Sequence, residues 1–538
     1  MTGLAHAPDR PSAAGAGERR NAVRGVAWGG VESAATAAVG FLLTPLIVHV
    51  AGIEGLGLWS ASWSLAHTSG LLDFGVGGSY ARFTSRAIAT GDTSALNGTV
   101  GAGLGFHLGL SLLIGISAIT MGRAVVARLA PSGPLATAAP VILGCILAQV
   151  LIRLTLSAYR GVVAGAQRID LLGRVGAVAT IVEGCGGAAV LLSGGGLRGL
   201  AVNSLAVGLL QSAAEGLVAH RLCPGLRIRP FRARRSEWRE FLSFGLRLQA
   251  TRAAEILGAH APRLALAAGP GLLSAGVYDL GARVAGGLQV LGGLPLPVIQ
   301  PLATRLQARG DRPRLRALVE RSTRYVALLV LPCAALLLLD ARDILVAWTG
   351  RDVPAGAAAS ARWLAAAAAV TLLASPTRLA LRGLGHPGTE AAAVLSGSIL
   401  NLGLAIACAS PFGAGGVAAA ALGGSLLSAA IVDRGARRRA SEGLGGPARP
   451  LLALVLAALA ALAAGAALHA AHPGPGPGLA SRAAAVRSLL PEAMLVGSAF
   501  LLGAILAGQI GSDDLEVVCD IVPIRVSTPL RSGPGARQ

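Results

Sequence analysis

Charged side chains are scarce in this sequence: they make up 13% of its 538 residues, and aromatic side chains make up only 4%. Soluble domains usually contain about 25% charged residues. A soluble protein of this length would need more polar surface than these residues provide. The apolar residues instead come in runs of roughly twenty, the length with which a helix crosses about 30 Å of hydrocarbon. We therefore predict that lipid surrounds most of the chain.

Lysine is absent, so that all 46 basic residues are arginines. A formal net charge of +20 would fit a nucleic-acid-binding protein only if the arginines formed one basic face. They are spread over many short loops instead, and we predict no nucleic-acid partner. The six cysteines lie far apart and form no CxxC pair, which indicates packing residues and neither a metal site nor disulfides.

Several catalytic motifs are also missing. The sequence has no Walker A loop, no HExxH, no GxSxG, and no paired aspartates of the kind that hold a metal in prenyl or glycosyl transferases. We therefore predict that the protein is not an enzyme, with no catalytic residue, no metal and no cofactor. No cleavable signal peptide is evident, because the first apolar run is too long for one.

Fourteen apolar runs can be recognised along the chain. They span about 25–50, 56–78, 98–121, 136–159, 171–193, 198–219, 242–267, 273–297, 325–346, 360–381, 390–410, 414–432, 451–470 and 489–510. Only helices and closed barrels satisfy every backbone amide inside a bilayer, and the ten-residue alternation of a barrel is absent. We predict an all-α polytopic membrane protein with about 14 transmembrane helices.

The arginines indicate the orientation of these helices. The two tails and alternate loops carry most of them, with the largest groups at 221–239 and 305–324. Cytoplasmic loops of membrane proteins are enriched in Lys and Arg. We therefore place both termini in the cytoplasm, and the unbroken alternation supports an even number of spans.

Two segments of the chain are similar to each other. TPLIVHVAG at 44–52 and APRLALAAG at 261–269 both place a proline seven residues before a glycine, and an aromatic residue follows each, Trp59 and Tyr278. The segments lie in the first and the seventh run, six runs apart, which indicates two six-helix halves related by a parallel repeat. Transporters built in this way bind substrate between the halves. We divide the chain into six parts. They are a flexible cytoplasmic N-terminus (1–24), an N-terminal six-helix bundle (25–219), a basic cytoplasmic linker (220–241), a C-terminal six-helix bundle (242–432), a basic loop with two additional transmembrane helices (433–510), and a cytoplasmic tail (511–538).

Several stretches resemble one protein family. The resemblance is carried by NAVRGVAWGGVESAATAAVGFLLTPLIVHVAGIEGLGLWS, LLDFGVGGSYARFTSRAIATGD, FLSFGLRLQ, VYDLGARVAGGLQVLGGLPLPVIQPLATRLQARGD, ILVAWTGRD and LALRGLGHPG. In this order they are similar to the oligosaccharide flippases of the polysaccharide-biosynthesis family (O-antigen flippase type), within the multidrug/oligosaccharidyl-lipid/polysaccharide exporter superfamily. The resemblance covers about residues 20–435 and includes no invariant catalytic signature.

The resemblance implies a V-shaped pair of bundles that alternates access between the two sides of the bacterial cytoplasmic (inner) membrane. It implies export of an undecaprenyl-pyrophosphate-linked sugar repeat unit for surface polysaccharide, and thus partners among membrane lipids and polysaccharide assembly proteins.

The seventh run carries an unusual number of charges. Ionisable groups at membrane depth cost about 2.5–3.5 kcal/mol each on insertion scales, so they usually face a cavity. Arg252 and Arg263 lie within about 20° of each other on a helix of 3.6 residues per turn, and Glu255 lies about 60° away. We predict a charged stripe that binds a pyrophosphate, because guanidinium groups bind phosphate oxygens bidentately. The alternative is that Arg252 and Glu255 only neutralise each other within the helix.

Other charged residues extend this predicted site. Asp279 and Arg283, one turn apart on the eighth run, lengthen the stripe, or else form an intrahelical pair without a binding role. Arg153 on the fourth run and Glu32 on the first are the candidates from the opposite half.

Three functions are compatible with these features. The leading one is a secondary flippase for lipid-linked sugars. A multidrug or metabolite extruder would be expected to have an acidic cavity for cationic substrates, whereas the seventh run is net basic. A membrane polysaccharide polymerase would be expected to have a large outer loop with catalytic residues, and the outer loops here are short.

Overall fold

The computed structural model describes residues 13–68, 71, 76–129, 134–227, 253–254, 256–444, 448–471 and 482–509. Within these ranges the regular elements are all helices, which confirms the predicted all-α class. The N-terminal elements are α1 (Ala13–Thr68), α2 (Val76–Thr90), α3 (Thr93–Leu129), α4 (Pro134–Thr155), α5 (Ser157–Gly165), α6 (Ile169–Leu192) and α7 (Gly196–Leu222). A helical stretch at 256–268 leads to α9 (Leu272–Gly293), η2 (Leu296–Val298), α10 (Ile299–Ala308), α11 (Arg312–Thr349), α12 (Ala355–Gly383), α13 (Pro387–Arg437), η3 (Ala440–Glu442), α14 (Ala448–Ala471) and α15 (Arg482–Leu506).

Each predicted apolar run coincides with helix wherever the structure describes it. Two long helices hold two runs each, and each breaks between them: α1 at Gly52 and α13 at Gly413, both at positive φ. Nine of the described helices are long and apolar enough to cross a membrane, or ten if the bent pair of α9 with η2 and α10 counts as one span. The second arms of α1 and α13, together with α11 and the stretch 256–268, account for the other runs.

Two helices were not predicted. α2 and α10 are short and amphipathic, with arginines such as Arg82, Arg86 and Arg305 on stretches that the sequence placed in loops. Within the second run the structure describes α1 as far as Thr68, then Leu71, and then α2 from Val76, and the other residues of 69–75 lie outside the described ranges.

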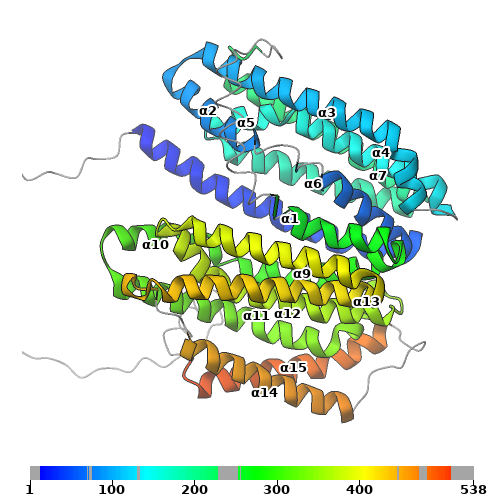
Figure 1. Ribbon diagram of the computed structural model, residues 1–538, viewed down its shortest axis with the longest axis vertical. Coiled ribbons are helices and arrows are strands. Elements are labelled where there is room, and N and C mark those ends of the chain that lie inside the picture. Colours follow the sequence, from blue (N-terminus) through cyan, green and yellow to red (C-terminus); the bar gives the residue numbers. More distant parts are fainter. Residues whose placement is uncertain are drawn as a thin grey trace, which may run out of the picture.

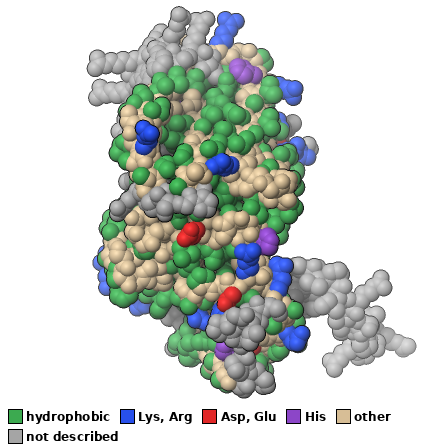
Figure 2. All heavy atoms as spheres, turned by 90° about the vertical axis from the view of Figure 1, so that its right-hand side faces the viewer, with side chains coloured by type: hydrophobic (Ala, Val, Ile, Leu, Met, Phe, Trp, Pro, Cys, Tyr) green, Lys and Arg blue, Asp and Glu red, His purple; other side chains and the backbone are tan. Residues whose placement is uncertain are grey.

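The helices form two groups with α1 between them (Figure 1). α2 to α7 lie together on one side, and α9 to α13 lie on the other, with α14 and α15 packed against α11 at the far edge. α1 packs on α6 of the first group and on α9 of the second. One face of the molecule is covered mainly by hydrophobic side chains with few charges (Figure 2). This surface and the long apolar helices identify a multi-pass membrane protein.

Equivalent positions of the two groups are separated by a constant number of residues along the chain. We call this number the repeat offset and define it as the sequence separation of Gly52 and Gly271. The offset relates three pairs of glycines that end or break helices at positive φ: Gly52 with Gly271, Gly91 with Gly310, and Gly194 with Gly413. It also carries α2 onto η2 with α10, α3 onto α11, and α6 with α7 onto the two arms of α13. The parallel repeat is thus present in the backbone.

The repeat extends to helix capping. Asp92 precedes α3 and accepts a hydrogen bond from the backbone N–H of Ala95 at 2.9 Å. Asp311, its equivalent under the repeat offset, precedes α11 and accepts one from the N–H of Arg314 at 3.1 Å. Each carboxylate satisfies an amide that has no partner within its helix.

The register differs from the one that the sequence comparison gave. Trp59 and Tyr278 are related by the repeat offset and are both buried, as the repeat requires. Pro45 and Pro262 are closer together along the chain than the offset, so they are not equivalent positions. The division of the chain into domains stays a prediction, since much of the linker at 220–241 is outside the described residues.

Candidate functional site

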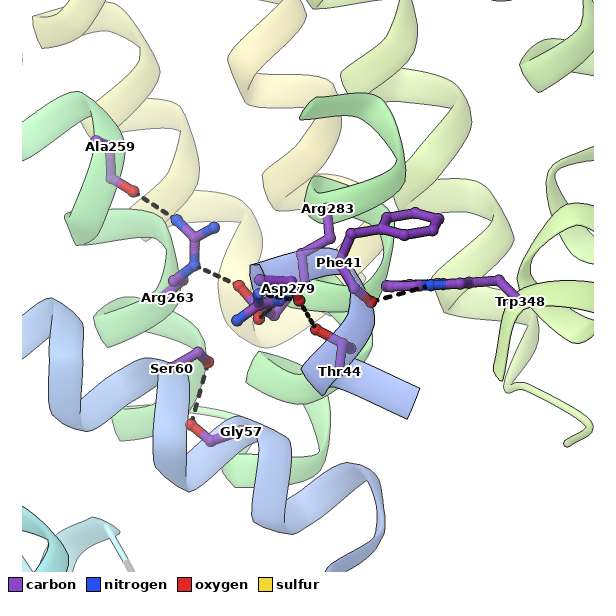
Figure 3. A network of polar contacts seen from close by, with 10 residues as sticks. Phe41, Thr44, Gly57, Ser60, Ala259, Arg263, Asp279, Arg283 and Trp348 are labelled. Carbon is purple, nitrogen blue, oxygen red and sulfur yellow. Dashed lines mark hydrogen bonds and ion pairs between the residues drawn. The ribbon is translucent and has the colours of Figure 1, made fainter. Parts of the chain in front are cut away.

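Arg263, Asp279 and Arg283 form one ionic network beside α1 (Figure 3). Oδ1 of Asp279 accepts a hydrogen bond from Nε of Arg263, and Oδ2 accepts one from Nε of Arg283, both at 2.8 Å. The Asp279 side chain is 3% exposed, whereas those of Arg263 and Arg283 are 22% and 25% exposed. Two arginines thus share one buried carboxylate, and the network keeps a net positive charge.

The two guanidinium groups retain hydrogen-bonding capacity. Nη1 of Arg263 donates to the carbonyl of Ala259 at 2.7 Å, and its guanidinium lies 5.6 Å from the ring centre of Tyr278. Nη1 of Arg283 donates to the carbonyl of Gly40 at 3.0 Å. Neither Nη2 donates to a described residue, and a planar guanidinium with free N–H groups suits phosphate oxygens.

Two consecutive carbonyls of α1 attach it to the second group of helices. The Gly40 carbonyl accepts from Arg283 of α9 and, at 2.6 Å, from the hydroxyl of Thr44. The Phe41 carbonyl accepts from the indole Nε1 of Trp348 in α11 at 3.2 Å, and the two aromatic rings stack with centres 4.5 Å apart (Figure 3).

Pro45 explains why the Phe41 carbonyl is free to accept. Proline has no N–H, so it removes the hydrogen bond that a helix would form to the carbonyl four residues earlier. Pro262 has the same effect on Gly258, whose carbonyl accepts from Nδ2 of Asn401 in α13 at 3.5 Å. Each proline therefore exposes a carbonyl, and a neighbouring helix bonds to it in both cases.

α1 and α9 cross at two glycines without room for a side chain. A Cβ at Gly57 would lie 1.9 Å from the carbonyl oxygen of Leu272, and one at Gly276 would lie 2.0 Å from that of Ile53. Gly57 and Gly276 are equivalent positions under the repeat offset, and so are Ile53 and Leu272. The two halves therefore contribute equivalent segments to the crossing. It follows the break at Gly52 and closes this end of the interface between the halves.

A histidine contact spans the same interface. The ring of His260 stacks on that of His67 in α1, with centres 5.1 Å apart, and its Nδ1 lies 3.4 Å from the hydroxyl of Ser64. Arg153 of α4 acts electrostatically on His67 and on Glu183 of α6.

The structure brings only some of the predicted site residues together. Arg263, Asp279 and Arg283 are joined, although the sequence paired Asp279 with Arg283 alone. Arg153 is exposed on α4 and forms no hydrogen bond or ion pair with a described residue of this network. The carboxylate of Glu32 in α1 occupies the space beside Gly176 of α6. Arg252 and Glu255 lie outside the described residues, so their place in a stripe stays a prediction.

The ionic network has no counterpart in the first half. The repeat offset places Thr44, Ser60 and Ser64 where Arg263, Asp279 and Arg283 stand. These three residues are buried, and the hydroxyl groups of Thr44 and Ser60 donate hydrogen bonds to carbonyls of their own helix. The repeat therefore keeps the backbone geometry and changes the charge.

A large cavity of about 1040 Å³ lies within the first group, between the second arm of α1, α3 and α4. Its lining is mostly apolar, with Arg123 as the charged residue among the described ones. This chemistry suits hydrocarbon and not a charged headgroup.

Sequence reasoning missed Trp348, Gly40 and the carbonyl of Phe41. A signal was present, because a proline inside a long apolar run predicts an unpaired carbonyl one turn earlier. It also missed the repeated TSRAIATGD and ATRLQARGD, at 84–92 and 303–311, which give the register of the repeat directly.

Comparison with known proteins agrees with this architecture. Residues 141–351 match a family model described as polysaccharide biosynthesis protein, and no curated protein matches the chain by sequence. The lipid II flippase MurJ in an inward closed conformation superimposes with a TM-score of 0.69 at 11% identity, over 88% of this chain and 98% of that one. The family model thus confirms the resemblance read from the sequence within residues 141–351, and the structural likeness confirms the fold that it implied.

Two further solved structures share the fold. One is an inward-facing multidrug resistance transporter of the MATE family in the MOP superfamily, with a TM-score of 0.61 at 14% identity over 78% of this chain and 98% of that one. The other is a MOP superfamily transporter from Pyrococcus furiosus whose binding pocket is described as having reverse polarity, with a TM-score of 0.51 at 14% identity over 80% and 97%. At these identities the likeness establishes the fold.

Proposed function

We propose, with the MOP superfamily fold as the premise, that this protein is a secondary transporter that flips a polyprenyl-pyrophosphate-linked oligosaccharide across the bacterial cytoplasmic membrane. Both termini lie in the cytoplasm in this proposal, and the substrate is moved without chemical conversion. The family model that matches residues 141–351 supports a role in polysaccharide biosynthesis.

The observation that carries the proposal is the net positive network of Arg263, Asp279 and Arg283 at the face of the second half that meets α1. A buried carboxylate fixes both guanidinium groups by their Nε atoms and leaves Nη donors on each. A diphosphate offers several anionic oxygens to such donors. A cationic drug would be repelled by the same network.

Access requires α1 to move relative to the second half. The Arg283 to Gly40 and Trp348 to Phe41 hydrogen bonds must then break. A released Nη1 of Arg283 would become available to a phosphate oxygen, so the substrate would compete with the α1 carbonyl for one donor. This competition couples headgroup binding to separation of the halves.

The test is a pair of neutral substitutions, Arg263→Gln and Arg283→Gln, in the native host deleted for the wild-type protein. Arg316→Gln is the matched control, because Arg316 also pairs with an acid one turn away, Glu320, but on an exposed face of α11. At equal protein levels we expect both network variants to lose surface glycan and to trap lipid-linked repeat units on the cytoplasmic face.

Two results would count against the proposal. Wild-type export by both network variants would remove the arginines from substrate binding. Normal glycan in the deletion strain, together with raised sensitivity to cationic drugs, would favour a multidrug extruder of the same fold.

A further inference from the structure

Three ionisable side chains from three helices meet where α14 and α15 pack on α11. They are Asp340 of α11, His469 of α14 and Glu492 of α15, and one donor atom of each lies within 4.8 Å of the other two. Nδ1 of His469 is 3.0 Å from Oε1 of Glu492 and 3.4 Å from Oδ1 of Asp340. Close packing surrounds them, since a Cβ at Gly465 would contact both Leu339 and Val496.

The acids of this cluster are buried and outnumber its one basic side chain, His469. Asp340 is 2% exposed and Glu492 is 3% exposed, and neither oxygen of Asp340 accepts a hydrogen bond from a described residue. A third acid, Asp343, is 6% exposed and accepts only from the hydroxyl of Ser488 among the described residues. Glu492 faces His469, whereas Asp340 has no hydrogen bond from a described residue, and a buried carboxylate in that state costs several kcal/mol unless a proton or a cation neutralises it.

The arginine nearest to the cluster does not neutralise it by contact. Arg362 of α12 acts electrostatically on Asp340, but its Nε and Nη2 donate to the carbonyls of Leu338 and Leu339, at 2.9 and 3.0 Å. These carbonyls precede the point where α11 departs from helical geometry, at Asp340 itself (φ −107°, ψ 23°). Arg362 thus holds the distorted backbone in place and leaves the Asp340 oxygens available.

We propose that Asp340, His469 and Glu492 bind a divalent transition-metal ion such as Zn²⁺ or Mn²⁺. An imidazole nitrogen with carboxylate oxygens favours these ions over Mg²⁺ and Ca²⁺, which prefer oxygen ligands alone. Ligands about 2.1 Å from a tetrahedral or octahedral ion stand about 3.0–3.4 Å apart. The two distances from His469 Nδ1 match these values without rearrangement.

The ion would have a route and a structural consequence. The His469 side chain is 43% exposed, so one side of the site lies at the surface of the protein. The ligands come from α11 and from both helices of the C-terminal pair, so the ion would fix α14 and α15 on the second half. In the predicted orientation His469 lies at the extracytoplasmic end of α14, and the ion would enter from outside the cell.

The experiment uses the purified full-length protein in lipid nanodiscs, stripped with a chelator and titrated calorimetrically with Zn²⁺, Mn²⁺ and Mg²⁺. We expect one Zn²⁺ or Mn²⁺ per chain, no comparable binding of Mg²⁺, and a higher unfolding temperature with the metal bound. His469→Gln and Glu492→Gln should each weaken binding at least about tenfold. His386→Gln is the matched control, because His386 faces one carboxylate, Glu442, at 3.3 Å without a third ligand among the described residues.

The wild-type titration decides the proposal even if a variant fails to fold. Absence of stoichiometric Zn²⁺ or Mn²⁺ binding by the wild type would overturn it and leave shared protons to neutralise the cluster. Unchanged binding by folded His469→Gln and Glu492→Gln would overturn it as well. Glycan export is not the readout, so failure of the proposed function and failure of this site can be distinguished.

Discussion

The hydrogen bond from Trp348 to Phe41 provides a sharp test of how α1 is held. The Phe41 carbonyl has no donor inside α1, because the residue four positions later is Pro45, and the indole of Trp348 donates to it at 3.2 Å. Trp348→Phe keeps an aromatic ring against Phe41 and removes the donor. Pro45→Ala restores an N–H that can bond to the same carbonyl within the helix. The two substitutions should therefore be coupled.

The expected magnitude follows from the state of that carbonyl. Hydrogen bonds in membrane proteins contribute about 0.6 kcal/mol on average and at most about 1.7 kcal/mol. Leaving a buried acceptor without a donor costs about 1–3 kcal/mol. We expect Trp348→Phe to lower the free energy of unfolding by about 1–2 kcal/mol when Pro45 is present. In the Pro45→Ala background, Trp348→Phe should lower the free energy of unfolding by about 1 kcal/mol less, because the N–H introduced at position 45 can bond to the Phe41 carbonyl. The cost of replacing the indole ring by the smaller phenyl ring is the same in both backgrounds and cancels in the comparison.

The assay is equilibrium unfolding of the four proteins of this cycle in mixed detergent micelles. Asn401→Ala serves as the control, since Asn401 donates to the carbonyl freed by Pro262 and should be additive with Pro45→Ala. The reasoning is refuted if Trp348→Phe costs the same in both backgrounds, within the error of about 0.3–0.5 kcal/mol typical of independent sites.

Two further predictions concern the repeat. Gly57→Ala and Gly276→Ala should both lower the unfolding temperature, because each added Cβ would collide with a carbonyl of the partner helix. Gly286→Ala on α9 should leave it unchanged, since open space surrounds that position. Equal effects of the three substitutions on the unfolding temperature would contradict the crossing. Asp92→Ala and Asp311→Ala should each cost about 1 kcal/mol in chemical unfolding as lost N-caps, with Asn in place of Asp restoring most of it, and a negligible cost at either site would show that its cap does not stabilise its helix.

The fold was largely predictable, because lipid imposes a simple rule. Runs of about twenty apolar residues become helices wherever backbone amides lack water. The gaps between the runs 25–50 and 56–78, and between 390–410 and 414–432, contain or adjoin the glycines where α1 and α13 break. The amphipathic α2 and α10 were missed because a search for continuous apolar runs does not find helices that have one apolar and one polar face.

The candidate site was predictable only in part. Asp279 and Arg283 stand one turn apart in one helix, which spacing alone reveals. The link from Arg263 to Asp279 joins two helices, and the angular argument that placed Arg263 on a stripe could not show its partner. The cluster of Asp340, His469 and Glu492 had no signal in the sequence, because its residues come from three helices and match no motif.

The forces between the halves are of a different kind from those within them. The ion pairs between described residues lie within one half, within the C-terminal pair of helices, or between that pair and the second half. The carbonyls of Gly40 and Phe41 in α1 accept single hydrogen bonds from the second half, each worth about 0.5–3 kcal/mol. The other contacts described between α1 and the second half include ring stacking, the His260 contact with Ser64, and the packing of α1 on α9.

This division of forces favours a movement of α1 that leaves the charged network intact. Separating the halves breaks hydrogen bonds that water or a substrate can replace, whereas the carboxylate of Asp279 keeps both of its arginines throughout. Thr44, Ser60 and Ser64 occupy the equivalent positions of α1, so that helix carries no opposite charge there to hold the network. In the proposed transport cycle, the absence of charge at these positions of α1 would let the helix cover and uncover the basic network without breaking an ion pair.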